Sequence, residues 1–351
     1  MKKFLDCISV VGSTPSRFQG TKKYVSTGAV ATTEIDESEV VEVSYEDRPS
    51  RANLTAEAGD ILFAKMQGTR KTLLLDSETE ENIYSTGFYA VRANPEIITT
   101  ECLYYLVDSE LFLAQKDKNC SGATQKAITN GGLAKIEIRI PPLSEQAVLT
   151  EKLRYLTQLI ADRKKQLELF DEVIKSRFIE MFGDPITNSK CLPTNDLGKV
   201  LLLKAGDFTA ASDIAAEPTT ENTYPCYGGN GIRGYVAEYN QEGTYSLIGR
   251  QGALSGNVQY ATGKFKNTEH ALLVTPLIEM NSVWLNHLLI NLDLQRYQTG
   301  AAQPGLSVKN LQEIPIIEVP KEEQNQFAAF VEQTDKSKYH GEFTYETEVA
   351  A

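Results

Sequence analysis

Two stretches of the sequence, 122–142 and 300–320, match each other at a constant shift of 178 residues. Each begins with Gly-Ala, contains an apolar segment rich in isoleucine and ends on a proline. At 351 residues the chain is long enough for two domains with separate cores. The repeat therefore predicts two copies of one unit. The matched pairs are Gly122/Gly300, Ala123/Ala301, Gln125/Gln303, Leu133/Leu311, Ile136/Ile314, Ile138/Ile316, Pro142/Pro320, Glu145/Glu323 and Gln146/Gln324.

Composition excludes several classes of protein. Hydrophobic residues make up 41% and charged residues 23%, which is typical of globular proteins. No run of 18 apolar residues occurs, and Asp6 interrupts what would be the apolar part of a signal peptide, so we expect a cytoplasmic protein. Five cysteines without a Cys-x-x-Cys pair predict reduced thiols and no zinc site.

The net charge of −12 lowers the expectation of nucleic-acid binding without excluding it. Phosphate is bound by a local patch and not by the average charge. Many of the acidic residues are concentrated in a few segments. Basic residues gather elsewhere, at Lys22-Lys23, at Lys65 with Arg70-Lys71, and at Lys264 with Lys266.

Both halves show the same order of predicted elements, which gives an α/β (α+β) fold class. In the first half, the patterns predict strands in "GDILFAKM" and "YSTGFYAVRA", a helix in "TTECLYYLVDSELF" and a closing strand in "KIEIRIPP". In the second half, "GTYSLIGRQG" and "EHALLVTP" predict strands, "NSVWLNHLLINLDLQRY" predicts a helix and "EIPIIEVP" predicts the closing strand.

A long helix is predicted from about Ser144 to Phe182, since no Gly or Pro interrupts this segment and Gly183 and Pro185 follow it. Such a helix would be about 58 Å long at 1.5 Å per residue. Its apolar positions recur at alternating steps of four and three, which favours a coiled coil whose partner helix runs from residue 322 onward. An amphipathic helix lying on one domain remains the alternative. The seam comprises Leu149, Leu153, Leu156, Ile160, Leu167, Phe170 and Ile174, with Arg163, Arg177 and Met181 in register.

These features together resemble the specificity subunit of type I restriction–modification systems. The resemblance covers about residues 1–338, and the stretches that carry it best are "IRIPPLSEQ", "FIEMFGDP" and "GAAQPGLSVKNLQEIPI". It implies two target-recognition domains separated by long coiled-coil helices. The implied boundaries are 1–143 for the first domain, 144–183 for the spacer helix, 184–321 for the second domain, 322–338 for the start of a second helix and 339–351 for a tail.

The resemblance also implies a function. Each domain would read one half of a split double-stranded DNA target, and the helices would fix the gap and dock methyltransferase subunits, two of them, together with restriction motor subunits. The chain itself would have no catalytic residues and no cofactor. One departure is that the heptad spacing fails after Lys338, where "YHGEFTYETEVAA" follows; truncation or recombination would produce such a tail.

Candidate DNA contacts are polar residues in loops and turns beside strands. Arg and Lys suit guanine edges and phosphates, whereas Gln and Asn suit adenine. The alternative for each is a solvated surface side chain, and for Gln125 and its equivalent Gln303 a role in a structural turn. The candidates are Lys65, Gln67, Arg70, Lys71, Gln125 and Lys126 in the first half, and Asn230, Arg233, Arg250, Gln251, Lys264 and Lys266 in the second.

Motifs for other chemistry are weak. "GNGIRG" at 229–234 fits a dinucleotide fingerprint, but strand-like segments flank it on both sides, so we expect a turn. No phosphate-binding G-x-x-x-x-G-K-[ST] motif occurs, and His270, His287 and His340 have no metal-ligand spacing. A two-module protein adaptor that binds no DNA and a stand-alone nuclease–methyltransferase remain alternatives.

Overall fold

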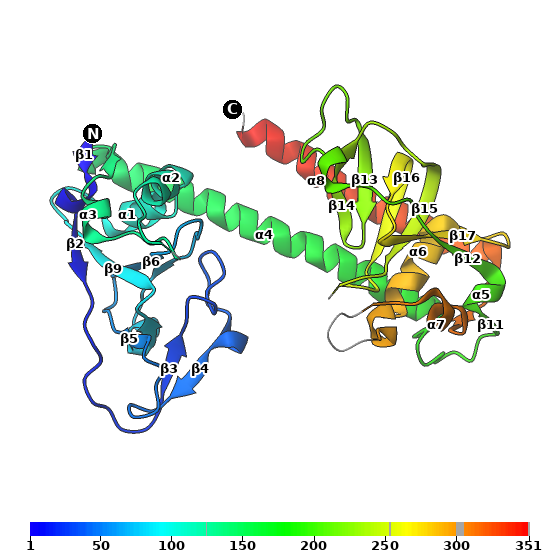
Figure 1. Ribbon diagram of the computed structural model, residues 1–351, viewed down its shortest axis with the longest axis horizontal. Coiled ribbons are helices and arrows are strands. Elements are labelled where there is room, and N and C mark those ends of the chain that lie inside the picture. Colours follow the sequence, from blue (N-terminus) through cyan, green and yellow to red (C-terminus); the bar gives the residue numbers. More distant parts are fainter. Residues whose placement is uncertain (124, 253, 300–304, 350–351) are drawn as a thin grey trace. The chain divides into compact units, whose positions relative to one another are not determined.

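The computed structural model describes residues 1–123, 125–252, 254–299 and 305–349, with side chains up to residue 338. The chain divides into two compact units, Met1–Asp162 and Arg163–Ala351 (Figure 1). Every hydrophobic core cluster draws its residues from one unit only. The prediction of a mixed fold with two similar domains is therefore confirmed.

Unit 1 is built around two four-stranded sheets. The sheets have the orders β2-β9-β6-β7 and β4-β3-β8-β5, and β1 pairs separately with β10. The strands are β1 (Lys2–Lys3), β2 (Ile8–Val11), β3 (Lys22–Val25), β4 (Val41–Val43), β5 (Ala52–Leu54), β6 (Ile61–Ala64), β7 (Thr72–Leu74), β8 (Ile83–Ser85), β9 (Phe88–Ala93) and β10 (Glu137–Ile138). The helices are α1 (Thr100–Val107), α2 (Glu110–Lys118) and α3 (Asn130–Leu133), followed by the start of α4 (Leu143–Phe182).

Two elements of unit 1 that the sequence pattern joins are divided. The strand expected in "YSTGFYAVRA" is split at 86–87, because β8 pairs with β3 and β5 whereas β9 pairs with β2 and β6. The helix expected in "TTECLYYLVDSELF" is divided, because α1 ends at Val107 and Ser109 caps a new helix by accepting a hydrogen bond from the backbone nitrogen of Phe112 at 3.2 Å.

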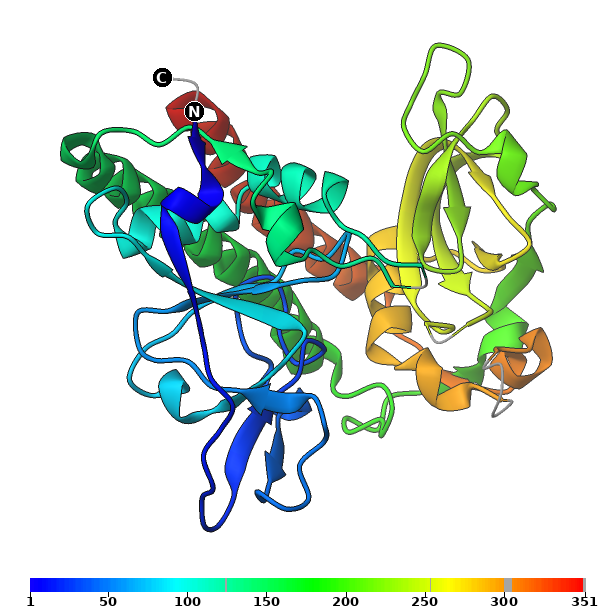
Figure 2. The same ribbon diagram turned by 60° about the vertical axis from the view of Figure 1, so that its left-hand side comes forward.

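Unit 2 contains one six-stranded sheet in the order β12-β17-β15-β16-β13-β14, and β11 pairs with β18 beside it. Helix α6 packs on β15 and β16, as Figure 2 shows. The strands are β11 (Thr194–Asp196), β12 (Leu201–Ala205), β13 (Tyr224–Gly228), β14 (Gly231–Val236), β15 (Gln241–Gly249), β16 (Val258–Asn267), β17 (Ala271–Pro276) and β18 (Pro315–Ile317). The helices are α5 (Leu197–Val200), α6 (Ser282–Asn291), α7 (Val308–Gln312) and α8 (Lys321–Val349).

The duplication predicted from the sequence is visible in the backbone. In unit 1 the nitrogen of Phe4 donates to the carbonyl of Ile136 at 2.9 Å, and in unit 2 the nitrogen of Leu197 donates to Ile314 at 2.8 Å. Ile136 and Ile314 are one of the matched pairs. Each hydrogen bond closes an antiparallel two-stranded ribbon, β1 with β10 and β11 with β18.

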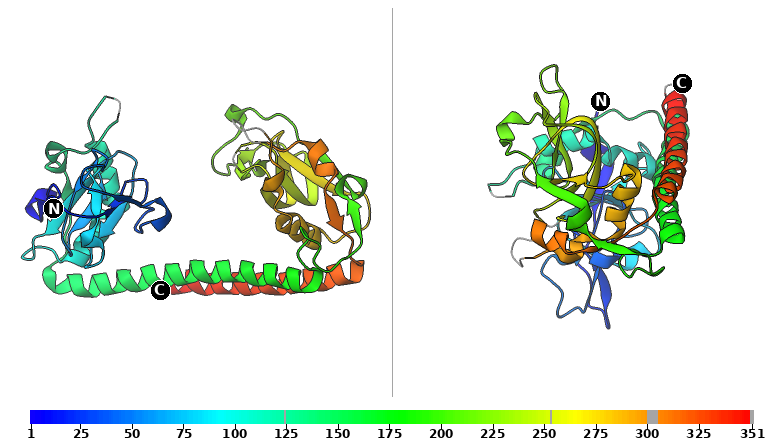
Figure 3. Two further views of the ribbon diagram at one scale, coloured as in Figure 1. Left: turned by 90° about the horizontal axis from the view of Figure 1, so that it is seen from below. Right: turned by 90° about the vertical axis from the view of Figure 1, so that its right-hand side faces the viewer.

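Helix α4 spans 40 residues and confirms the predicted long helix. It ends at Gly183, whose φ of 78° suits the residue that terminates a helix. In unit 2 its last turns pack against α8, and the rings of Phe178 and Phe182 lie 5.3 and 5.8 Å from that of Phe327. Figure 3 shows α8 (red) beside this part of α4 (green), and the contacts run antiparallel. The second half thus supplies a partner helix, as predicted.

Candidate nucleic-acid interface

In unit 1 the fold brings together two loops that lie about sixty residues apart in the sequence. The turn between β6 and β7 meets the segment before α3, where the nitrogen of Gln67 donates to the carbonyl of Lys126 at 2.9 Å. Met66 also forms an isolated bridge with Ala127. The side chains of Gln67, Gln125 and Lys126 are exposed and have no hydrogen-bonding partner among the described residues. Three predicted contacts therefore share one surface.

The three cations of the first loop are held by protein groups. The ammonium of Lys65 donates to the carbonyl of Thr86 at 2.9 Å and lies 4.6 Å from the Tyr89 ring centroid, and burial lowers its pKa. Lys71 donates to the carbonyl of Thr27 at 2.5 Å. These lysines fix the loop, and their contact with DNA stays a prediction.

Arg70 joins this loop to the corner between α1 and α2. Its guanidinium lies 2.7 Å from the carboxylate of Asp108 and 3.0 Å from that of Glu110. The hydrogen bond to Asp108 is the largest cause of the raised pKa of Arg70. A phosphate would therefore have to compete with two carboxylates for this side chain, and a DNA contact by Arg70 also stays a prediction.

Sequence reasoning missed Lys116, whose ammonium is buried under the same loop. The residue is 1% exposed, and its Nζ donates to the carbonyls of Met66 at 2.7 Å and Thr69 at 3.0 Å. The neighbouring Asp117 accepts a hydrogen bond from the nitrogen of Gly68 at 3.0 Å. A signal was present in the sequence, since Lys116 lies one helical turn after the buried Phe112 and so shares its face of α2.

In unit 2 only residues 229–230 of the "GNGIRG" segment form the expected turn, because Gly231 to Gly234 already belong to β14, and a strand rather than a helix follows the turn. A side chain at Gly249 would collide with the carbonyl of Gly229, so glycine is required where β15 approaches this turn. Asn230 accepts a hydrogen bond from the side chain of Asn257 at 2.9 Å, which leaves its own amide nitrogen available to a ligand.

Three further polar residues gather next to this turn. The nitrogen of Arg250 donates to the carbonyl of His270 at 3.0 Å, and the His270 ring lies 3.1 Å from the carboxylate of Glu269. Arg250 Nε, His270 Nδ1 and Glu269 Oε2 are buried, and none has a hydrogen-bonding partner within the described residues. Buried polar atoms are normally paired, so this cluster is suited to bind a polar ligand.

The other predicted contacts of unit 2 lie beside this cluster or along two strands. Gln251 is exposed and bridges to Gly305, while the matched Gly300 and Gln303 lie outside the described residues. Arg233 on β14 is exposed, and its stem fills the space that a side chain at Gly228 would occupy.

Lys264 and Lys266 lie two residues apart on β16, so they belong to one face of that strand. The ammonium of Lys264 is 4.7 Å from the Tyr239 ring centroid and 4.0 Å from Glu242. The hydrogen bond with Tyr239 and the charge of Glu242 raise the pKa of Lys264, so it carries a positive charge at neutral pH. An exposed lysine such as Lys264 is suited to phosphate, and Lys266 is half-buried on the same face.

The predicted seam of α4 differs between its two ends. Near the C-terminal end Ile174 is 3% exposed, and Leu167 and Phe170 are half-buried. Near the N-terminal end Leu149 is 40%, Leu156 37% and Ile160 43% exposed, with Leu153 half-buried between them. We name Leu149, Leu156 and Ile160 the exposed seam. It is an apolar stripe along a helix, a surface suited to a further helix.

Among the residues that the structure describes, no three His, Cys, Asp or Glu side chains are placed to hold a metal ion. None of the helices in those residues is long and apolar enough to cross a membrane. His287, dismissed as a ligand from its spacing, is a packing residue whose ring lies 5.4 Å from that of Phe327.

Two curated proteins are similar to part of this chain. The specificity subunit of the type I restriction enzyme EcoprrI of Escherichia coli is 38% identical over 174 residues, which is 49% of this chain and 41% of that protein. A candidate type I specificity subunit of Haemophilus influenzae is 32% identical over 110 residues, 30% of this chain and 29% of that protein. The matches thus span less than half the length of these curated relatives.

One solved structure and one family model complete the comparison. The crystal structure of a type I restriction–modification S subunit from M. genitalium covers 99% of this chain and 92% of its own, with a TM-score of 0.57 at 16% identity, which shows a common fold. The model of the type I restriction modification DNA specificity domain matches residues 12–169 and again residues 195–342. The chain belongs to this family and carries two copies of its domain.

Proposed function

We propose that this chain is the DNA-recognition subunit of a type I restriction–modification complex in the cytoplasm. Each of its two domains reads one half of a bipartite double-stranded target. The observation that carries the proposal is the double match to a DNA specificity domain, one match over most of unit 1 and the start of unit 2 and the other within unit 2, together with the same closing ribbon and backbone hydrogen bond in both units. Two domains built alike are suited to two half-sites.

The polar loops are the surfaces that we assign to DNA. In unit 1 this surface carries Gln67, Gln125 and Lys126, and in unit 2 it carries Arg250 and Gln251 beside the hairpin turn. Amide and guanidinium groups discriminate base edges, with about 1–3 kcal/mol for each bidentate pair. Lys264 and Lys266 would contact phosphates. These local cations let a chain of net charge −12 bind a polyanion.

We assign the gap between the half-sites to α4. A stiff connection makes the second binding event intramolecular, which increases affinity only when the spacing fits. A continuous helix of 40 residues is such a connection. Recognition would then depend on the base edges in each half-site and on the number of base pairs between them.

The exposed seam is the surface that we assign to partner subunits. Three large apolar side chains at heptad spacing are solvent-exposed on α4, and apolar stripes of this kind pack against further helices. The partners would be methyltransferase subunits, two of them for two half-sites, and restriction motor subunits. These partners would supply the catalysis, since we propose no catalytic group and no cofactor for this chain.

The experiment starts from the assembled complex. Methylome sequencing of cells that carry the chain with its partner subunits identifies the target, and a labelled duplex with that target then measures binding by the purified chain at increasing salt. We expect binding that weakens steeply, because neutralised phosphates release counterions. A protein adaptor would retain no DNA at any salt. Methylation or cleavage by the isolated chain with S-adenosylmethionine, magnesium and ATP would contradict the non-catalytic role.

A further inference from the structure

A buried glutamine joins α4 to the rest of unit 1. Gln146 lies in the first turn of α4 and is 0% exposed. Its Oε1 accepts a hydrogen bond from the backbone nitrogen of Thr99 at 2.7 Å, and its Nε2 donates to the carbonyls of Ile97 at 2.9 Å and Pro141 at 3.0 Å. Thr99 is the residue that caps α1. One side chain therefore binds the start of a domain helix and the corner that leads into the long helix.

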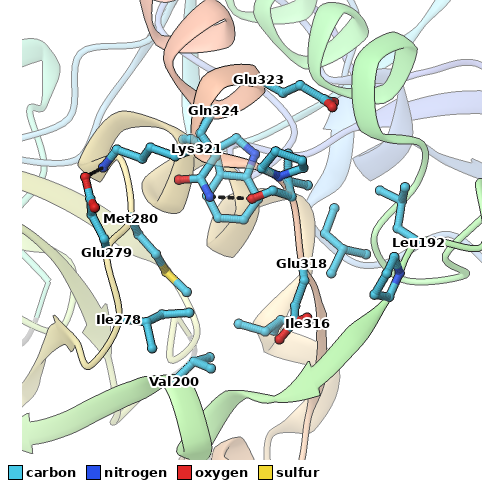
Figure 4. A pocket seen from close by; sticks show the side chains of 15 residues that line it. Leu192, Val200, Ile278, Glu279, Met280, Ile316, Glu318, Lys321, Glu323 and Gln324 are labelled. Atoms are coloured by element: carbon cyan, nitrogen blue, oxygen red, sulfur yellow. Dashed lines mark hydrogen bonds and ion pairs between the residues drawn. The ribbon is translucent and has the colours of Figure 1, made fainter.

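The same arrangement recurs in unit 2 with the matched residue, Gln324. This side chain is 4% exposed in the first turn of α8. Its Oε1 accepts from the backbone nitrogen of Asn281 at 2.8 Å, and its Nε2 donates to the carbonyl of Val319 at 2.8 Å, a bond drawn in Figure 4. Asn281 caps α6, as Thr99 caps α1.

The two joints are equivalent in sequence as well as in geometry. Gln146 and Gln324 differ by 178 residues, and so do the carbonyl acceptors Pro141 and Val319. In both joints the amide oxygen of the glutamine accepts a hydrogen bond from the backbone nitrogen of an N-cap residue, that of α1 in unit 1 and that of α6 in unit 2. If this position served packing alone, an apolar side chain would be sufficient. A buried amide whose oxygen and nitrogen are both hydrogen-bonded fixes the relative orientation of the two segments that it joins, because hydrogen bonds weaken steeply when they are bent.

The surroundings of the second joint show why a directional contact is needed. An open pocket of about 640 Å³ lies beside the corner between β18 and α8; its lining includes the apolar Ile278, Met280 and Ile316 and the charged Glu279, Glu318 and Lys321 (Figure 4). The first turn of α8 borders this pocket, and close packing of the helix begins one turn later, at Phe327. Gln324 and the hydrogen bond from Asn281 Nδ2 to Asn325 Oδ1, 2.9 Å, hold it to the cap of α6.

We propose that Gln146 and Gln324 are positioning residues. Each fixes the angle between its recognition domain and the long helix that starts there, α4 in unit 1 and α8 in unit 2. Together they set how strictly the protein selects the gap between half-sites. The inference rests on the proposed function. Neither glutamine reads a base. A domain whose helix can pivot would still bind its own half-site but would accept a wider range of gaps.

The test uses the full chain with Gln146→Met, Gln324→Met and the double variant. Methionine keeps the length of the side chain and removes its hydrogen bonds. The matched controls are Glu145→Met and Glu323→Met, because these neighbours are exposed in the same turns. Binding is measured on duplexes that carry the target with its natural gap, with the gap changed by one base pair, and with one half-site alone.

We expect each glutamine variant to lose about ten-fold of the preference for the natural gap, because the effective concentration of the second half-site is spread over more orientations. Binding to single half-sites and the preferred letters should stay as in the wild type, which also shows that the domains remain folded. The controls should keep wild-type gap selectivity.

Unchanged gap selectivity in the double variant overturns the inference, and so does a loss of single half-site binding, which would mean that the glutamines only support the domain fold. Asn325→Ala provides a milder variant of the second joint, for which we expect a smaller change in the same direction. If the wild-type chain bound no duplex, the proposed function itself would be contradicted. That result is distinct from glutamine variants that bind DNA with unchanged gap selectivity.

Discussion

Lys338 Nζ on α8 lies 2.6 Å from Asp171 Oδ1 on α4, which joins two residues 167 positions apart in the sequence. Lys338 also lies 3.3 Å from Asp335 on its own helix. The Asp171 side chain is 74% exposed, so water screens the ion pair. Such contacts specify how two helices align and add little to stability.

The helix pair should therefore depend on its aromatic residues more than on its charges. We expect Phe327→Ala to lower the free energy of unfolding by about 3–5 kcal/mol, since Phe327 is 0% exposed and packs on Phe178 and Phe182. Lys338→Ala should lower it by less than about 1 kcal/mol. Urea unfolding of both variants measures the difference, and equal effects would contradict this account of the helix pair.

Stability should fall on mild acidification through His287. Burial lowers its pKa to about 4, with opposing influences from Asp335 and Lys338. His287 in the unfolded chain binds a proton near pH 6.5, whereas in the folded chain it does so only near pH 4. The stability that comes from neutral His287 is therefore fully present above pH 6.5 and is lost between about pH 6.5 and 4, on the order of 3 kcal/mol in all. Urea unfolding at pH 7.5 and 5 should show a smaller pH dependence for His287→Leu. An unchanged slope would exclude this residue.

Replacement of Lys116 should weaken binding to the half-site that unit 1 reads and leave binding to the other half-site unchanged. In Lys116→Met the carbonyls of Met66 and Thr69 lose their donor, so the loop that carries Gln67 should become disordered. We expect affinity for the first half-site to fall about ten-fold or more, which corresponds to one buried hydrogen bond. Lys118→Met, an exposed position on the same helix, is the control. Equal losses at both half-sites would indicate general destabilisation.

The salt dependence of binding should report Lys264 and Lys266. If both contact phosphates, replacing the pair with alanine should reduce the slope of log affinity against log salt by about two. Preference among sequences should change little. Measuring affinity at four salt concentrations for the wild type and the variant gives the slopes, and identical slopes would remove these lysines from the interface.

Shortening α4 should change the preferred gap. Removal of one heptad, seven consecutive residues within 149–181, shortens the helix by about 10 Å, which is roughly three base pairs of duplex. The heptad register is kept, so α8 can still pack on the helix. We expect methylome sequencing to show the same half-site letters with a smaller gap. New letters at an unchanged gap would contradict the role of α4.

Patterns with a strong period were predictable from the sequence. The heptad spacing and Gly183 defined α4 to within one residue at its start, and the repeat defined two equivalent ribbons. The split between β8 and β9 was not predictable, because it depends on which sheet each strand joins. The end of α6 depends on Asp293, whose φ of 47° is a left-handed conformation that the apolar pattern does not reveal.

Candidate site residues were harder to predict, since exposure and partners depend on tertiary contacts. Gln67 and Lys126 were named separately, and only the fold brings them together. Arg70 was named for its charge, whereas its partners Asp108 and Glu110 lie in another element. The matched Gln146 and Gln324 were visible as a repeat, but their hydrogen bonds could not be read from identity alone.

The separation of the cores by unit has a genetic consequence. Among the side chains that the structure describes, each hydrophobic cluster draws either on residues up to 162 or on residues from 163 onward. A crossover inside the α4 coding segment of two related genes would leave each interior complete, provided that the heptad register is preserved. Cells could then acquire a new target by exchanging one half of the gene, without a period in which the protein fails to fold.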